Sequence, residues 1–178
     1  MYKKIKDAFH KPIRGRILGI SEIDNFDFLI DKSESEIIVT AYPEVNMQKL
    51  PFKKEVFDFI ISDQVLEHLE NPTKAINESY RVLKKGGIAI HTTCFINYFH
   101  PSPKDYWRFS PDALRLLCKN FSEVIQCEGW GNKIATLISL LGDRFRKIKI
   151  PEKRSLRRWI ATKNNKRYPI VSWIIAKK

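Results

Sequence analysis

Apolar residues along the chain fall into two patterns, short continuous runs and longer helical stripes. The short runs are rich in β-branched and aromatic residues, and their length and continuity are typical of strands buried on both faces. Six such strands are predicted, at residues 16–20, 36–40, 56–62, 87–94, 122–128 and 169–177. Helical segments separate most of them, and this alternation predicts an α/β fold with a parallel, doubly wound sheet.

Capping signals mark where helices begin. Asn71 precedes Pro72 and Ser110 precedes Pro111, and each pair is typical of an N-cap followed by the first helical residue. Gly86 is expected to end the first of these helices. A third helix, amphipathic and basic, is predicted from residue 133, with one apolar stripe formed by Ile134, Leu137, Ile138, Leu141, Phe145 and Ile148.

The length of 178 residues predicts one domain over residues 1–178, with 43% hydrophobic residues to build its core. Residues 1–15 are expected to form an N-terminal helix or arm, and residues 133–167 a basic helical insertion before the last strand. No apolar run approaches the roughly 18 residues of a membrane span. The N-terminal residues lack the apolar stretch of a secretory signal. We therefore expect a cytoplasmic protein without a transmembrane segment.

The net charge of +12 is concentrated at one end of the chain. Residues 1–132 hold equal numbers of basic and acidic residues, whereas residues 133–178 hold 14 Lys and Arg against Asp143 and Glu152. Such a region can bind nucleic acid, acidic lipid headgroups or an anionic substrate, and it can equally be a solvated face without a partner.

The three cysteines predict neither a disulfide nor a metal site. Cys94, Cys118 and Cys127 are odd in number, lack close spacing and lie in or beside predicted core elements. Buried free thiols are expected. No Ser-His-Asp order, phosphate-binding loop or metal-ligand spacing suggests another reaction.

One segment carries most of the chemical information. The strand at 56–62 is followed by Ser62, Asp63 and Gln64, at the strand end where open α/β sheets bind their ligands. LPF at 50–52, FD at 57–58, VLEH at 65–68 and RVLKKGG at 81–87 together resemble class I S-adenosylmethionine-dependent methyltransferases, of the type 11 kind. Lys85 stands where that family usually has proline.

The resemblance implies a Rossmann-like, doubly wound, mostly parallel sheet whose last strand is antiparallel and inserts beside the fifth. It also implies S-adenosyl-L-methionine as the cofactor. Residues 41–49 alone separate the second strand from LPF. We therefore expect a sheet trimmed between strand two and strand four.

The cofactor signals of the family are incomplete here. Of its glycine-rich turn, only Gly19 and the small Ser21 remain, and Tyr42 follows the second strand without a carboxylate. Asn46 and Met47 stand where relatives contact the adenine, although Asn46 can instead cap a turn and Met47 can fill the core. The site is either divergent or decayed. The predicted cofactor-binding residues are Gly19, Ser21, Tyr42, Asn46, Met47, Ser62, Asp63 and Gln64.

The loop that follows the predicted strand at 87–94 is the predicted acceptor site. FINYFHPSPKDYWRFSPDAL at 95–114 resembles a segment of methyltransferases associated with glycan tailoring. The predicted substrate residues are Tyr98, Asp105, Tyr106 and Arg108. The alternative is that the aromatic residues pin the loop to the core while Arg108 pairs with Asp105.

These features predict methyl transfer to a small-molecule or sugar hydroxyl. Such an acceptor must lose a proton, and His100 is the first candidate base, followed by His68. Two alternatives stay open: a catalytically silent methyltransferase-fold interaction module, and an RNA-directed methyltransferase that uses the basic C-terminal region. Because the N-terminal segment is short, we expect an open pocket, or one closed by a second copy in a homodimer or by a partner protein.

Overall fold

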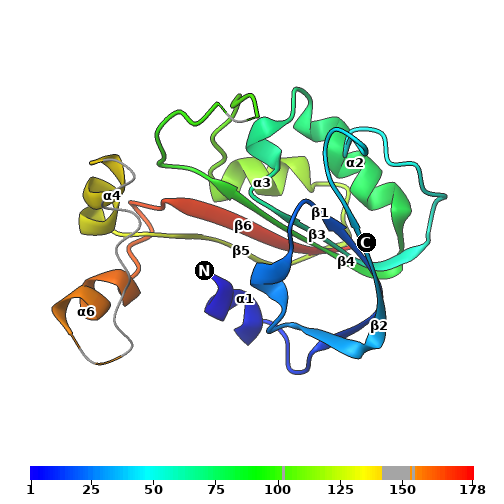
Figure 1. Cartoon of the computed structure of the whole chain (residues 1–178), viewed down its shortest axis with the longest axis horizontal. Coiled ribbons are helices and arrows are strands. Elements are labelled where there is room, and N and C mark those ends of the chain that lie inside the picture. Colours follow the sequence, from blue (N-terminus) through cyan, green and yellow to red (C-terminus); the bar gives the residue numbers. More distant parts are fainter. Residues whose placement is uncertain (102, 142–152, 154) are drawn as a thin grey trace.

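The computed structural model describes residues 1–101, 103–141, 153 and 155–178, and it is built on one six-stranded sheet (Figure 1). The sheet has the order β2-β1-β3-β4-β6-β5, in which β1 to β4 pair in parallel and β6 is antiparallel to both neighbours. This confirms the mostly parallel sheet with an antiparallel last strand. The strands are β1 (Ile13–Ile20), β2 (Ile30–Thr40), β3 (Phe57–Asp63), β4 (Leu83–Cys94), β5 (Glu123–Trp130) and β6 (Val171–Lys177).

Strand β2 begins six residues earlier than predicted. Its first half, residues 30–35, carries Asp31, Lys32 and Glu34, and Ile30 is the one buried side chain among these six residues. β2 pairs only with β1 within the described sheet, so it is an edge strand. Charged residues are common on edge strands because they discourage pairing with other chains. The apolar-run criterion therefore missed this half.

The connections around β2 are short. Residues 41–56, all of them described, contain no helix or strand, which confirms the expected trimming between strand two and strand four. The connection between β1 and β2 is also reduced, since it contains only the short helix η1 (Asp24–Phe26). Two connections between parallel strands, which usually contain full helices, are thus reduced here to a loop and to a loop with one short helix.

The two faces of the sheet bury separate clusters of apolar side chains. Ile60 and Ile61 are neighbours on β3, and they point into different clusters because successive strand residues face opposite sides. The cluster that contains Ile60 packs under α2 (Pro72–Val82) and α3 (Pro111–Leu117). The cluster that contains Ile61 packs against α1 (Tyr2–Asp7) and η1 on the other face (Figure 1).

The capping predictions for α2 and α3 are confirmed. Asn71 Oδ1 accepts a 2.9 Å hydrogen bond from the backbone of Lys74, and Ser110 Oγ accepts one of 3.2 Å from Ala113. The expected end of α2 at Gly86 is wrong. Leu83 has an extended backbone and pairs with Phe57, so β4 begins where the helix ends.

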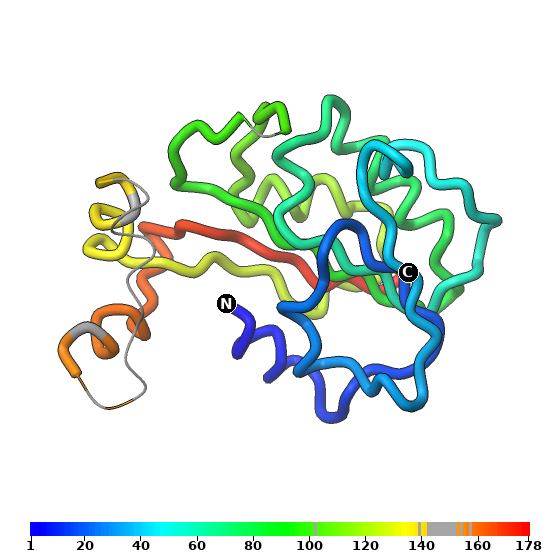
Figure 2. The backbone as a smooth tube through the Cα atoms, viewed as in Figure 1, coloured from blue at the N-terminus to red at the C-terminus, as the bar shows by residue number. Residues whose placement is uncertain are grey.

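Among the described residues of the basic C-terminal region are two short helices, which lie beyond the end of the β5–β6 pair (Figure 2). They are α4 (Lys133–Leu140) and α6 (Leu156–Thr162), and the side-chain amide of Asn132 joins them by donating to the carbonyls of Ile160 and Lys163. The rest of the predicted stripe, at Phe145 and Ile148, lies outside the described residues. Leu137 on α4 is exposed.

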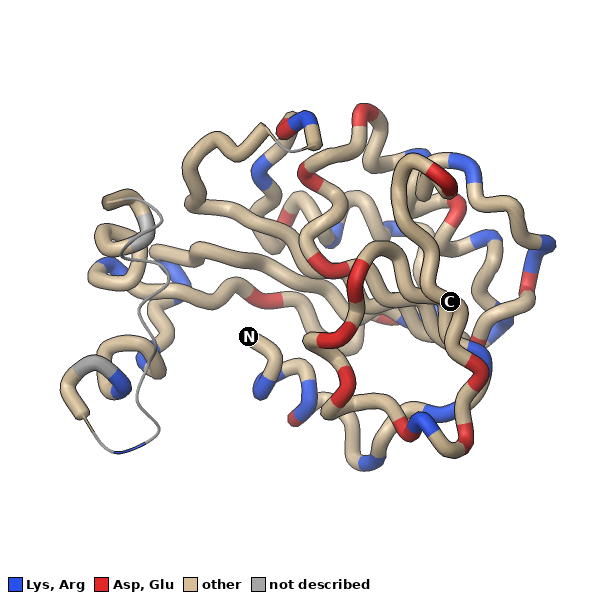
Figure 3. The backbone as a smooth tube through the Cα atoms, in the orientation of Figure 1, with Lys and Arg blue, Asp and Glu red and all other residues tan. Residues whose placement is uncertain are grey.

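The charged residues also differ between the C-terminal region and the rest of the chain. Among the described residues from 133 onward all the charged side chains are Lys or Arg, whereas acidic and basic residues are interspersed over the rest of the chain (Figure 3). Within the described ranges, no helix is long and apolar enough to cross a membrane.

Candidate active site

Two unusual backbone conformations face each other at the carboxyl ends of β1 and β3. Ile20 pairs with Ser62, and just beyond this pair Ser21 has φ +66° and Gln64 has φ +55°. This left-handed region is uncommon for residues other than glycine, and such backbone tends to gather at ligand sites. Ser21 therefore takes the conformation that a glycine usually supplies, and the two turns lie at neighbouring strand ends, where the candidate cofactor crevice is expected.

Gly19 has a packing reason within the chain itself. A Cβ atom at Gly19 would lie 2.8 Å from Cδ1 of Ile23, which is closer than real Cβ contacts. Ile23 is buried in the cluster beneath α1. The close approach that Gly19 permits is therefore used by a side chain of the same protein.

Asp63 is the most densely bonded carboxylate of the crevice. Its Oδ2 accepts hydrogen bonds from the Tyr2 hydroxyl at 2.7 Å and from the side-chain amide of Asn25 at 3.0 Å, and its Oδ1 accepts one from the Thr92 hydroxyl. Burial, together with the bond to Asp63, raises the pKa of Tyr2 above its ordinary value. Asp63 is only 9% exposed.

The remaining predicted cofactor residues are divided between surface and core. Tyr42 is 71% exposed beyond the end of β2, whereas Met47 is 2% exposed within the apolar cluster under α2. Asn46 Oδ1 accepts a 2.9 Å hydrogen bond from the backbone of Gln48, which is the bond of a turn cap. Ser62 is buried, and its hydroxyl lies 2.7 Å from Nδ1 of His91.

The candidate crevice keeps the backbone turns of a nucleoside cofactor site but lacks one polar group. The backbone at Ser21 and at Gln64 takes the left-handed conformation that glycine supplies in such turns. No carboxylate stands where β2 ends, at Thr40, Ala41 and Tyr42. Of the predicted cofactor residues, Ser21, Tyr42, Asp63 and Gln64 lie at or just beyond these strand ends, while Met47 and Ser62 are buried in the core.

His100 is oriented by a carbonyl and a carboxylate. Its Nδ1 lies 3.1 Å from the carbonyl oxygen of Tyr98 and 3.2 Å from Oδ2 of Asp105. A carbonyl can only accept, so Nδ1 carries the proton and the lone pair of the neutral ring is on Nε2. Arg108 holds Asp105 through two bonds, of 2.5 and 2.7 Å, and the pKa of Asp105 falls to about 2. The hydrogen bond from Arg108 is the main cause of this fall.

The same loop is tied to the VLEH segment. The backbone amides of Tyr106 and Trp107 both donate to the carbonyl of Glu67, and Nδ1 of His68 lies 2.8 Å from the carbonyl of Lys104. The rings of His68 and His100 meet edge to face, with centroids 5.1 Å apart. Both candidate bases and the predicted substrate residues are thus brought together at the carboxyl end of β4.

The aromatic side chains of the loop divide between packing and exposure. Phe109 is buried under α3, whereas Tyr106 and Trp107 are partly exposed. Trp107 Nε1 donates to the carbonyl of Leu69, and the Tyr106 hydroxyl donates to Glu70. Phe109 therefore pins the loop, while the faces of Tyr106 and Trp107 remain accessible. The expected pairing of Arg108 with Asp105 is present as well.

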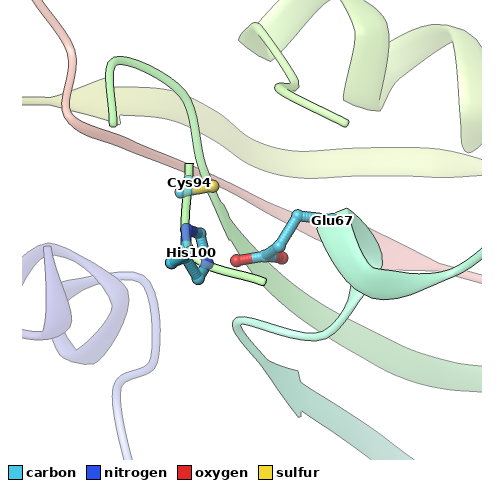
Figure 4. Close-up of side chains that lie close together, drawn as sticks. All are labelled: Glu67, Cys94 and His100. Atoms are coloured by element: carbon cyan, nitrogen blue, oxygen red, sulfur yellow. The ribbon is translucent and has the colours of Figure 1, made fainter. Parts of the chain in front are cut away.

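Sequence reasoning treated Glu67 and Cys94 as structural residues, and the structure places both beside His100 (Figure 4). Burial, followed by the nearby Glu67 carboxylate, raises the pKa of the Cys94 thiol to about 12. Tyr2 and Asn25 also reach the crevice unexpectedly. No local motif signals these residues, because their partners lie 26 to 61 positions away in the chain.

The strand order, the antiparallel β6 and the crevice at the ends of β1 and β3 define a class I methyltransferase fold. Residues 22–91 match the family described as a methyltransferase domain. The chain is therefore similar to methyltransferases over residues 22–91, and as a whole it shares the fold of solved S-adenosylmethionine-dependent methyltransferases.

Similar proteins extend this assignment. An uncharacterized protein of Methanocaldococcus jannaschii is 36% identical over 132 residues, which are 72% of this chain and 62% of that protein. The chloroplastic 2-methyl-6-phytyl-1,4-hydroquinone methyltransferase 1 of Oryza sativa is 29% identical over 105 residues, 57% of this chain and 30% of its own length. The chain thus spans less than two thirds of either relative. A Haloferax volcanii putative methyltransferase complexed with the Trm112 activator has a TM-score of 0.56 at 13% identity, covering 99% of this chain and 88% of that structure.

Proposed function

We propose that the protein transfers a methyl group from S-adenosyl-L-methionine to a hydroxyl of a small molecule or sugar. The observation that carries this proposal is the position of His100 Nδ1, which lies 3.1 Å from the Tyr98 carbonyl oxygen and 3.2 Å from Oδ2 of Asp105, a carboxylate that Arg108 holds in place. It presents the lone pair of His100 Nε2 at the carboxyl end of β4. A base oriented by a carboxylate is the arrangement that hydroxyl deprotonation requires.

Each part of the site has a role in this reaction. The cofactor, when bound, supplies an electrophilic methyl group on a sulfonium. Ser21 and Gln64 shape the crevice with their backbone, and Asp63 and Tyr42 stand at its rim. His100 takes the proton of the acceptor hydroxyl. Positioned proton transfer of this kind contributes on the order of 10²–10⁴ to the rate.

The exposed aromatic faces favour a ring-shaped acceptor. Tyr106 and Trp107 are held by hydrogen bonds at their polar ends, so their flat faces are fixed in direction and partly open. Such surfaces bind the apolar faces of sugar rings and of aromatic rings, while a polar group fixes orientation. A sugar is our first choice of acceptor, and a hydroquinone, the substrate in the name of the rice relative, is the second.

The proposal is tested in two stages on the full chain. Titration calorimetry with S-adenosylmethionine and S-adenosylhomocysteine measures cofactor binding first. Methyl transfer from labelled cofactor is then measured with monosaccharides, nucleotide sugars and hydroquinones. We expect His100→Gln to retain cofactor binding and to lose at least 10²-fold in kcat. His10→Gln, at an exposed position in the N-terminal segment, is the matched control. Full activity in His100→Gln would refute the assigned base.

A silent interaction module is the second candidate, and two contacts favour it. Ile23 occupies the space over Gly19, and Tyr2, Asn25 and Thr92 already satisfy Asp63. Both contacts fill places that a cofactor could use. Absence of calorimetric binding at millimolar concentrations of both nucleosides would favour this module over the enzyme. The Haloferax structure, a complex with an activator, makes a required partner protein the next variable to test.

A further inference from the structure

Three potential metal ligands converge beside the acceptor loop. Glu67 belongs to η2 (Leu66–His68), Cys94 ends β4, and His100 lies in the loop that follows. One ligand atom from each lies within 4.8 Å of the other two, and the side chains point toward a common centre (Figure 4). Glu67 and Cys94 are both buried. Their spacing along the chain resembles no metal motif, so the sequence predicts no metal site.

The buried carboxylate of Glu67 is only partly hydrogen-bonded within the described part of the chain. Its Oε2 accepts a 2.8 Å hydrogen bond from the Thr93 hydroxyl. Its Oε1 is buried and has no hydrogen-bond partner among the described residues. Leaving a buried polar atom unpaired costs about 1–3 kcal/mol, and more for a charged group. The Glu67 carboxylate is directed toward His100 and Cys94 (Figure 4).

The other ligands have the supporting contacts that metal sites use. The Nδ1 proton of His100 is directed at the Tyr98 carbonyl and at Asp105, which leaves the Nε2 lone pair available. Metal-binding histidines usually donate their other ring N–H to such an oxygen, and metal-binding carboxylates are themselves hydrogen-bonded. Thr93 supplies that second contact for Glu67.

We propose that Glu67 Oε1, Cys94 Sγ and His100 Nε2 form a binding site for a Zn²⁺-class divalent cation. The three donors are an oxygen, a sulfur and a nitrogen, a set that zinc accepts and that Mg²⁺ and Ca²⁺ disfavour. The ion replaces the thiol proton of Cys94, which leaves to solvent, so thiolate and carboxylate together balance its charge of two. Three protein ligands leave the fourth zinc position open.

A second group, His68, His100 and Asp105, also has its potential ligand atoms within 4.8 Å of one another. Its members are already engaged: Arg108 binds both oxygens of Asp105, and His68 Nδ1 bonds to the Lys104 carbonyl. This group therefore supports the first site from outside. The Nε2 lone pair of His100 cannot bind the ion and accept a proton at the same time, so the metal-loaded protein is expected to lack the base of the proposed methyl transfer. Ion binding is measured on the protein alone, so the two proposals are tested separately.

The site is tested by titrating the apoprotein with Co²⁺, as a coloured probe, and with Zn²⁺ in competition. We expect one ion per chain and a thiolate-to-cobalt charge-transfer band that Zn²⁺ abolishes. Cys94→Ser should lose the band, and Glu67→Gln and His100→Gln should weaken binding at least tenfold. Cys127→Ser, a buried cysteine of β5 outside the cluster, should leave both unchanged.

Circular dichroism establishes that each variant is folded. If Cys94→Ser does not fold, His100→Gln decides the question, because His100 is partly exposed and lies in a loop. Absence of stoichiometric binding to the wild-type protein, or affinity unchanged in His100→Gln, would overturn the proposal. A protein that binds Co²⁺ but no S-adenosylmethionine would keep the metal site and discard the methyltransferase reaction.

Discussion

The hydroxyl of Tyr2 donates a 2.7 Å hydrogen bond to Oδ2 of Asp63, a residue 61 positions further along the chain. This bond ties the first helix to the carboxyl end of β3. The Tyr2 ring packs edge-on against Phe26, with centroids 5.4 Å apart, so helix α1 and η1 are held over the same face of the sheet. The N-terminal segment, although short, therefore reaches the cofactor crevice.

We expect Tyr2→Phe to lower the free energy of unfolding by about 1–2 kcal/mol, because a partly buried carboxylate loses one of its donors while the ring packing remains. Urea denaturation measures the effect. Tyr106→Phe is the control, since its bond to Glu70 is exposed and its loss should cost less than about 0.5 kcal/mol. Equal costs in both variants would mean that the Tyr2 bond adds nothing beyond an exposed one.

His91 predicts a distinct dependence of stability on pH. It is fully buried, and burial lowers its pKa from 6.5 to about 4. Its Nε2 has no hydrogen-bond partner within the described residues. Below pH 6.5 His91 binds a proton in the unfolded chain, whereas in the folded protein it binds that proton only near pH 4. Stability is therefore complete above pH 6.5 and falls by up to about 3 kcal/mol as the pH drops to 4.

Chemical denaturation at several pH values tests this linkage. In His91→Gln the loss between pH 6.5 and 4 should shrink by most of that amount, whatever the variant's stability at pH 7. The other three histidines are present in both proteins, so their contributions cancel in the comparison. Parallel pH profiles for the two proteins would contradict the assignment.

Substitutions at Ser21 test whether the backbone turn after β1 is strained. We expect Ser21→Val to lower the free energy of unfolding by about 1–2 kcal/mol, because a β-branched residue is poorly tolerated at φ +66°. Ser21→Gly should stay within about 0.5 kcal/mol of the wild type, since relief of strain offsets the added freedom of the unfolded chain. Thermal denaturation gives the ranking. A valine variant as stable as the glycine variant would show that the turn relaxes.

Arg81, at the start of RVLKKGG, connects this segment to LPF at residues 50–52. Its guanidinium donates to the carbonyls of Leu50 and Phe52 and to both oxygens of Glu78. A lysine cannot reproduce this planar set of donors, so Arg81→Lys should cost about 1–2 kcal/mol, reduced by the partial exposure of the side chain. Arg115→Lys, which loses one bond to the Cys127 carbonyl, should cost less. Urea denaturation compares the two variants, and a reversed order would refute this role of Arg81.

Elements that have a clear local sequence pattern were predicted correctly from the sequence. The apolar run ending at Ser62 predicted β3 to within one residue, and the caps at Asn71 and Ser110 lie where they were expected. The short interval after β2 predicted the trimmed sheet. The parallel order predicts that the candidate site lies at the ends of β1, β3 and β4, because such strands end on one side of the sheet.

The roles of individual site residues depended on contacts between distant segments. Met47 is a core residue rather than a surface of the crevice, Ile23 fills the space over Gly19, and Glu67 turns its unpaired oxygen toward Cys94 and His100.

The sequence by itself determined the α/β class, the bounds of β3 to within one residue and the helix starts at Asn71 and Ser110, and it predicts the edge of the sheet that carries the candidate site. These follow from backbone preferences and apolar periodicity within about ten residues of chain. The tertiary structure alone decided which side chains meet at that edge, as when Tyr2 meets Asp63 and Glu67 meets Cys94 and His100. Such meetings depend on strand register and on the paths of loops, which the packing of the whole core sets.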